Sequence, residues 1–312
     1  MSKIKEYGLR FLVCIKKALP RSGKLCAWLL KIILPISLVV RLLQYWGIID
    51  LFSEYLTPIF QFIGLPGESA IVFITSCMLP LYAPIAIMTS IAFTLREATI
   101  LAIMCLISHN LPVECSITKK TGSGFWNMFF LRIGFSFLSA LLLNWVLPNY
   151  DQPFGTVTTL TSYSSIVEVL QAWIMSSFKL ICTILIVVSL LMIIQRVLID
   201  FNLMDKIAQP LTPVMRFFGL SDTSSFSWIV GYIVGLAYGG AVMVDLCEEG
   251  KISKSDSQLV NCHLSISHSM LEDTFLFVAI GISFWWIMGT RLLLAFIAVW
   301  GERIVRKLKT NP

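Results

Sequence analysis

The sequence contains an internal repeat, in which the second half resembles the first, and this duplication constrains the fold more than any other feature. Residues 48–65 align with residues 203–220 at an offset of 155 and share seven identities, whereas chance gives about one identity in eighteen residues. After a small insertion the offset becomes 159, and His109 then aligns with His268. The sequence therefore predicts two structural repeats that together cover nearly the whole chain.

Long apolar segments place both repeats in a membrane. Of the 312 residues 57% are hydrophobic and 13% charged, whereas a soluble domain carries about 25% charged residues. Residues 25–46 and 125–147 are each long enough to cross, because about 20 apolar residues span the hydrocarbon. The net charge of +6 comes from basic residues near segment ends and indicates no nucleic-acid partner. The predicted fold class is an all-α polytopic membrane protein, with the lipid bilayer as a partner.

The distribution of Lys and Arg predicts that the two repeats are inverted relative to each other. Residues 46–68 contain no Lys or Arg, whereas the aligned second-half segment contains Lys206 and Arg216. Because positively charged loops stay in the cytoplasm, the first segment is expected outside and its counterpart inside. Equivalent segments on opposite sides require an odd number of crossings in each half. Three crossings with a re-entrant hairpin and five shorter crossings both satisfy this requirement.

Composition shifts divide the chain into five predicted parts. These are a basic amphipathic N-terminal helix (1–24), a first membrane repeat (25–148), an external loop and amphipathic linker (149–176), a second membrane repeat (177–302) and a basic cytoplasmic tail (303–312). The N-terminal helix is expected to lie on the membrane surface. Basic residues near both ends of the chain predict that the N- and C-termini are cytoplasmic.

Each repeat has an apolar segment interrupted by helix-breaking residues near a tyrosine. The interrupting residues are Pro80 and Pro84 around Tyr82 in the first half, and Gly235, Gly239 and Gly240 around Tyr238 in the second. Broken or re-entrant helices free backbone groups that bind ions or polar solutes, and many secondary transporters use them at mid-membrane sites. Simple helix kinking is the alternative interpretation. The matching positions in the two halves favour a functional role.

A Ser-His motif recurs at the same place in both repeats. It reads ISHNLPVE at residues 107–114 and ISHSMLED at residues 266–273, with Glu114 and Asp273 five positions after the histidines. All three histidines of the chain lie in or just before these motifs. Ionisable groups at membrane depth cost about 2.5–3.5 kcal/mol or more and usually face a cavity or a partner. The paired motifs therefore predict a transport site.

The second motif also continues a polar stripe. Asn261, Ser265, His268 and Glu272 follow the spacing of one helix face. The stripe indicates either hydrogen bonds between helices or a polar wall for a solute, in which a histidine beside a carboxylate would also couple protons. The predicted substrate-binding residues are Tyr82, Ser108, His109, Asn110, Glu114, Tyr238, Asn261, Ser265, Ser267, His268, Glu272 and Asp273.

Other chemistry is not indicated by the sequence. It contains no P-loop, HExxH, GxSxG or dinucleotide motif, so neither an enzyme nor a nucleotide-driven pump is expected. The eight cysteines form no CxxC pair, which argues against a thiolate metal site. No cofactor or metal is predicted, although ligation of a metal by His263, His268 and Glu272 is an alternative.

The chain resembles a known membrane family in three short stretches. These are GLPGES at residues 64–69 and the two Ser-His motifs. They are similar to the Gate, or nucleoside-recognition, family, which includes the spore maturation A/B proteins and the gate domains of ferrous-iron transporter B. The resemblance implies a permease of the bacterial cytoplasmic (inner) membrane. The iron transporter's G domain and a clear cysteine gate are both missing from this sequence, and these two departures argue against iron transport.

The sequence as a whole predicts a secondary-type transporter for a small polar solute, nucleoside-like or an organic ion. Its binding site is expected near the membrane midplane, between the inverted repeats. A divalent metal-ion permease and a non-transporting membrane scaffold of the spore-maturation type are the alternatives, with an intramembrane hydrolase a more distant one. A homo-oligomer is compatible with the sequence.

Overall fold

A computed structural model describes residues 3–154 and 165–310 of the chain. This part is mostly helical, and its strands are the two-residue β1 (Phe93–Thr94) and β2 (Pro153–Phe154), which pair antiparallel. Five helical segments of the described part are long and apolar enough to cross a membrane: Glu6–Tyr45, Leu95–Lys120, Phe125–Val146, Ile166–Asp200 and Phe284–Lys309. The predicted all-α polytopic class is confirmed.

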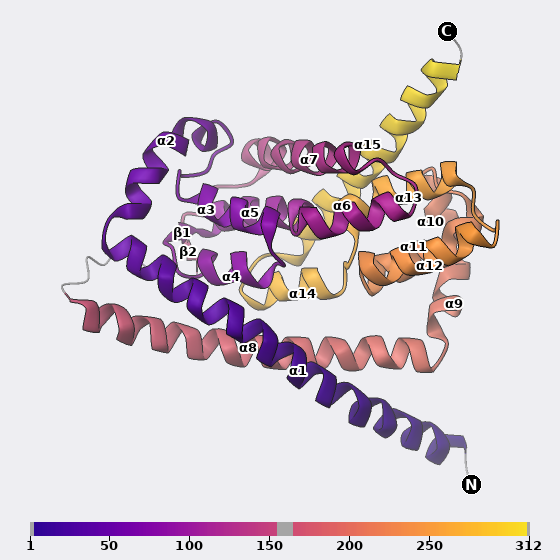
Figure 1. Cartoon of the computed structure of the whole chain (residues 1–312), viewed down its shortest axis with the longest axis horizontal. Helices are drawn as coiled ribbons and strands as arrows, with labels where there is room; N and C mark the ends of the chain where they lie inside the picture. Colours follow the sequence, from indigo (N-terminus) through magenta and orange to yellow (C-terminus); the bar gives the residue numbers. More distant parts are fainter. Residues whose placement is uncertain (1–2, 155–164, 311–312) are drawn as a thin grey trace.

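Two long helices cross one another along one side of the molecule. They are α1 (Lys3–Tyr45) and α8 (Ile166–Asp200), and the other helices pack above them in Figure 1. The Trp173 indole donates a hydrogen bond to Ser37 Oγ at 3.0 Å, which ties the two helices together. Helix α1 runs without interruption past residue 24, and α8 begins inside the predicted linker, so neither predicted boundary coincides with a helix end.

The remaining helices fall into two sequential groups. The first group is α2 (Ile48–Phe62), α3 (Ser69–Met78), α4 (Tyr82–Met88), α5 (Leu95–Ser108), α6 (Leu111–Lys120) and α7 (Phe125–Val146). The second is α9 (Leu203–Ala208), η1 (Gln209–Leu211), α10 (Thr212–Phe217), η2 (Asp222–Ser224), α11 (Ser225–Ile233), α12 (Leu236–Glu248), α13 (Lys254–Ser267), α14 (Glu272–Ala279) and α15 (Phe284–Thr310).

Helices α5 and α13 form the centre of the molecule. Helix α5 is apolar on all sides and buried from Ala98 to Ser108, as expected for a helix enclosed by other helices. Its start is fixed by a capping box, in which Thr94 and Glu97 exchange side chain to backbone hydrogen bonds. Helix α13 is buried over most of its length and contacts both α5 and α7.

The predicted helix breaks occur, but fewer residues cause them than the sequence suggested. Helix α3 ends at Met78 and α4 begins at Tyr82, so Pro84 lies in the first turn of α4, where proline is tolerated. In the second half the break is at Gly235, with φ +116°. The expectation that Gly239 and Gly240 interrupt the helix is wrong. Both lie inside α12, where a Cβ atom on Gly239 would come within 2.4 Å of the Gly231 Cα atom.

The two groups of helices make matching backbone contacts. The amide of Asn110 donates to Ser76 O at 2.8 Å, and the amide of Ser269 donates to Gly231 O at 3.1 Å. Asn110 and Ser269 both adopt the left-handed conformation, each with φ 50°. These pairs lie at the offsets of the sequence alignment. The inverted orientation of the halves in the membrane stays a prediction.

Candidate functional site

Both central helices end at a motif histidine. His109 follows the last residue of α5 and His268 follows the last residue of α13, and each has extended backbone angles. The Nδ1 atom of His109 lies 3.2 Å from Cys105 O, and the Nδ1 atom of His268 lies 2.7 Å from Leu264 O. A carbonyl oxygen only accepts hydrogen bonds, so each Nδ1 carries a hydrogen, and in a neutral ring each Nε2 then presents a lone pair.

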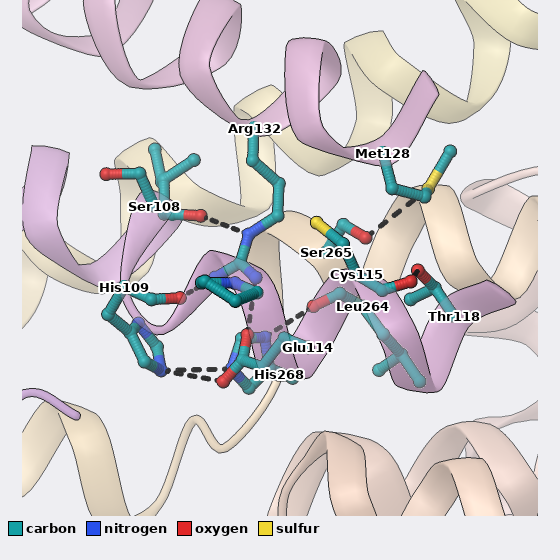
Figure 2. A network of polar contacts seen from close by, with 12 residues as sticks. Ser108, His109, Glu114, Cys115, Thr118, Met128, Arg132, Leu264, Ser265 and His268 are labelled. Carbon is teal, nitrogen blue, oxygen red and sulfur yellow. Dashed lines mark hydrogen bonds and ion pairs between the residues drawn. The ribbon is translucent and has the colours of Figure 1, made fainter. Parts of the chain in front are cut away.

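The two histidine rings meet where the two halves of the chain meet (Figure 2). Their Nε2 atoms are 3.3 Å apart. Glu114 Oε1 lies 3.1 Å from His109 Nε2 and 3.3 Å from His268 Nε2, and Asp273 Oδ2 lies 3.8 Å from His109 Nε2. These four side chains, which we call the His–carboxylate cluster, are only 2–10% exposed.

Two buried arginines hold the helix ends in place. The Arg132 side chain donates to Ile107 O at 2.7 Å and to His109 O at 2.9 Å. Arg291, at the aligned position, donates to Ile266 O at 2.8 Å and to His268 O at 2.7 Å. These carbonyls lie at helix C-termini, where they lack helical partners and attract positive charge. The arginines were not among the predicted site residues, although their alignment within apolar helices was a usable signal.

The carboxylates of the cluster are held differently in the two halves. Arg132 Nη1 pairs with Glu114 Oε2 at 2.6 Å, which leaves Oε1 facing the histidines. At the aligned positions, Asp273 Oδ2 and Arg291 Nη1 are buried and make no hydrogen bond with any residue in 3–154 or 165–310. Aspartate is one methylene shorter than glutamate, which accounts for the difference in reach. Asp273 Oδ2 therefore faces the cluster as an acceptor for which the described residues supply no hydrogen-bond donor.

Glu272, next to Asp273, is bound by two other helices. The Tyr82 hydroxyl of α4 donates to Glu272 Oε1 at 2.7 Å, and Gln195 of α8 donates to Oε2 at 3.2 Å. This link connects the motif of the second half to the break between α3 and α4 in the first. Gln195 was missed by sequence reasoning, because nothing in an apolar helix indicates which of its faces meets Glu272.

Comparison with known proteins identifies the family of the chain. The Gate profile, described as nucleoside recognition, matches residues 26–119, which include His109 and Glu114. The uncharacterized membrane protein YvoD of Bacillus subtilis is 30% identical over 281 residues, covering 88% of this chain and 90% of YvoD. The chain belongs to the Gate family. No solved structure matches it. The resemblance carried by the short motifs is thereby confirmed.

The predicted polar stripe of this Gate protein is not one helix face. Helix α13 ends at Ser267 and Glu272 belongs to α14, so the prediction of a continuous face is wrong. The side-chain Nδ2 of Asn261 instead donates to Thr121 Oγ1 at 2.9 Å, and Ser265 Oγ lies 3.5 Å from Met128 Sδ. These two contacts are of the interhelical kind that the sequence left open.

The other predicted site residues lie at the margins of the cluster or away from it. Ser108 Oγ donates to Met104 O, and Ser267 contacts the ring of His263 at 2.9 Å. Asn110 forms the left-handed turn after His109. Tyr238 is 64% exposed on α12 and has no place in the cluster.

The third histidine belongs to a separate aromatic group. His263 Nδ1 accepts a hydrogen bond from the Trp228 indole at 3.1 Å, and its ring packs edge-on against Phe218. The metal set of His263, His268 and Glu272 considered from the sequence is therefore not assembled. Among the described residues, His109, His268 and Asp273 instead place one ligand atom each within 4.8 Å of one another.

Proposed function

We propose that this Gate protein is a secondary-type transporter of the bacterial cytoplasmic membrane, with both termini in the cytoplasm. The His–carboxylate cluster is its binding site for a small polar solute or ion. One observation carries the proposal: the two motif histidines, 159 positions apart in sequence, meet at 3.3 Å together with a carboxylate from each half.

A role in stability alone accounts poorly for this cluster. Burying charged groups costs several kcal/mol each by order of magnitude, and replacing a buried ion pair by apolar side chains is often neutral or stabilising. Ionisable groups at membrane depth commonly mark pathways for ions and substrates. The position of the cluster between two halves with broken helices matches the sites of secondary transporters.

The contacts around the cluster suggest how alternating access would occur. The helix is interrupted after each histidine at a residue in the left-handed conformation, and the amide of that residue is bonded to a carbonyl of a neighbouring helix, Ser76 O of α3 or Gly231 O of α11. Movement of either broken helix would therefore move one histidine relative to the other. On this proposal the described conformation is a closed state, because the cluster is almost fully buried.

A ligand screen on the purified protein tests the proposal. Nucleosides, organic anions and divalent metal ions are added separately, and the unfolding temperature is measured for the wild type, His268→Ala and His263→Ala. A ligand at 100 times its Kd stabilises the native state by about 2.7 kcal/mol. We expect His268→Ala to lose the stabilisation and His263→Ala, a buried histidine outside the cluster, to keep it. Absence of any stabilising ligand would favour the membrane scaffold.

A further inference from the structure

We propose that the His–carboxylate cluster binds a divalent transition-metal ion such as Zn²⁺. The inference rests on the proposed function, because it names the class of cargo for the same site. Its starting point is the ligand set that the two halves bring together: two imidazole nitrogens and two carboxylate oxygens. Imidazole and carboxylate ligands are a common combination for Zn²⁺ and related ions.

The orientation of the rings is the first argument. Both Nδ1–H groups donate to backbone carbonyls, so in the neutral rings two Nε2 lone pairs and the Glu114 Oε1 atom lie within 3.3 Å of one another. The three lone pairs repel one another in the neutral rings, and a cation shared by the three atoms relieves this repulsion. A bridging proton joins only two of these atoms, whereas a metal ion binds all three and has room for a fourth ligand.

The spacing of the ligand atoms is the second argument. Tetrahedral coordination with metal–ligand distances near 2.0–2.2 Å places neighbouring ligand atoms roughly 3.3–3.6 Å apart. The Nε2–Nε2 distance is 3.3 Å, and the distances from Glu114 Oε1 to the two Nε2 atoms are 3.1 and 3.3 Å. Asp273, whose Oδ2 lies 3.8 Å from His109 Nε2, offers a ligand atom within 4.8 Å of those of both histidines and is the candidate for the fourth position.

The groups behind the ligands are the third argument. Histidines that bind metals usually donate their other ring N–H to a carbonyl or carboxylate, and ligating carboxylates are themselves held by hydrogen bonds or charges. Both histidines here donate to a carbonyl of the preceding helix turn, and Arg132 holds Glu114 at 2.6 Å. Asp273 Oδ2 is buried without a hydrogen bond inside the described ranges, which leaves it available to the ion.

The net charge of the His–carboxylate cluster favours a transported ion over a permanently bound structural metal. The two carboxylates are opposed by the buried guanidinium groups of Arg132 and Arg291, so the cluster has little net negative charge to retain a cation. A transport site must bind its ion favourably and still release it. We therefore expect measurable but reversible binding, with one ion per chain.

Equilibrium binding of Co²⁺ tests the inference without depending on transport. The full chain in detergent is treated with a chelator, desalted and titrated with Co²⁺, whose visible absorption reports tetrahedral nitrogen and oxygen coordination. We expect one Co²⁺ per chain, displaced by Zn²⁺. Loss of a residue that hydrogen-bonds a metal ligand weakens metal binding by about 10–100-fold. His268→Ala removes a ligand itself, so we expect it to weaken Co²⁺ binding by at least about 100-fold. Asp273→Asn should weaken it less, and His263→Ala should leave it unchanged.

Two results would overturn the metal site. One is a monodisperse, folded wild type that binds no Co²⁺, and the other is binding that His268→Ala leaves intact. If the wild type binds no Co²⁺ but transports a metal-free solute that His268→Ala does not transport, the proposed transporter stands and the metal assignment alone falls. If Co²⁺ binds as expected but no solute or metal crosses the membrane, the site stands and the transport proposal falls.

Discussion

At the scale of residues, the cluster depends on which ring nitrogen of each histidine faces the other histidine. The sequence was sufficient to pair His109 with His268 and to single out Glu114 and Asp273. It did not show that Glu114 reaches the histidines of both halves, because that depends on how α6 packs against α13. It also missed Arg132 and Arg291, since a lone arginine in an apolar helix does not reveal the carbonyls it binds.

Unequal roles of the two arginines lead to a stability prediction. Arg132→Met removes two hydrogen bonds to carbonyls and leaves Glu114 as an unpaired buried charge, which costs about 3–5 kcal/mol. Arg291→Met removes the same carbonyl bonds but no close ion pair, so a smaller loss is expected. Urea or thermal unfolding in detergent measures both. Equal losses, or a larger loss for Arg291→Met, would contradict the asymmetry described for the cluster.

At the scale of elements, the sequence predicted the breaks better in the first half than in the second. Pro112 and the left-handed tendency of Asn110 signal the end of α5. Ser269 carries no such signal: α13 ends at Ser267, and the Ser269 amide bonds Gly231 O of α11. Helical periodicity therefore predicted one continuous polar stripe, because the break between α13 and α14 depends on tertiary contacts.

The backbone at Gly235 gives a prediction for the break between α11 and α12. Its φ of +116° and ψ of 164° belong to a region that only glycine occupies readily. Gly235→Ala is expected to cost about 1–3 kcal/mol through strain. Gly134→Ala in α7 is the control, because a Cβ atom there meets nothing within 4 Å. A stability of Gly235→Ala equal to that of the control would show that the break is not rigid.

At the scale of the whole molecule, the account needs the two halves to cross the membrane in opposite directions. Alkaline phosphatase fused after Leu65 should be active, because that position is expected outside, whereas the same fusion after its counterpart Leu220 should be inactive. A fluorescent protein that matures only in the cytoplasm should give the reverse pattern. The same result at both positions would mean parallel repeats and would remove the basis for a shared mid-membrane site.

Metal uptake into liposomes containing the purified protein tests the central claim most directly. That claim is that the two halves of the chain jointly bind a cargo at the His–carboxylate cluster and move it across the membrane. The account predicts saturable uptake of radioactive Zn²⁺ by the wild type and by His263→Ala, and uptake no faster than protein-free liposomes for His268→Ala. Uptake by His268→Ala at the wild-type rate would contradict it.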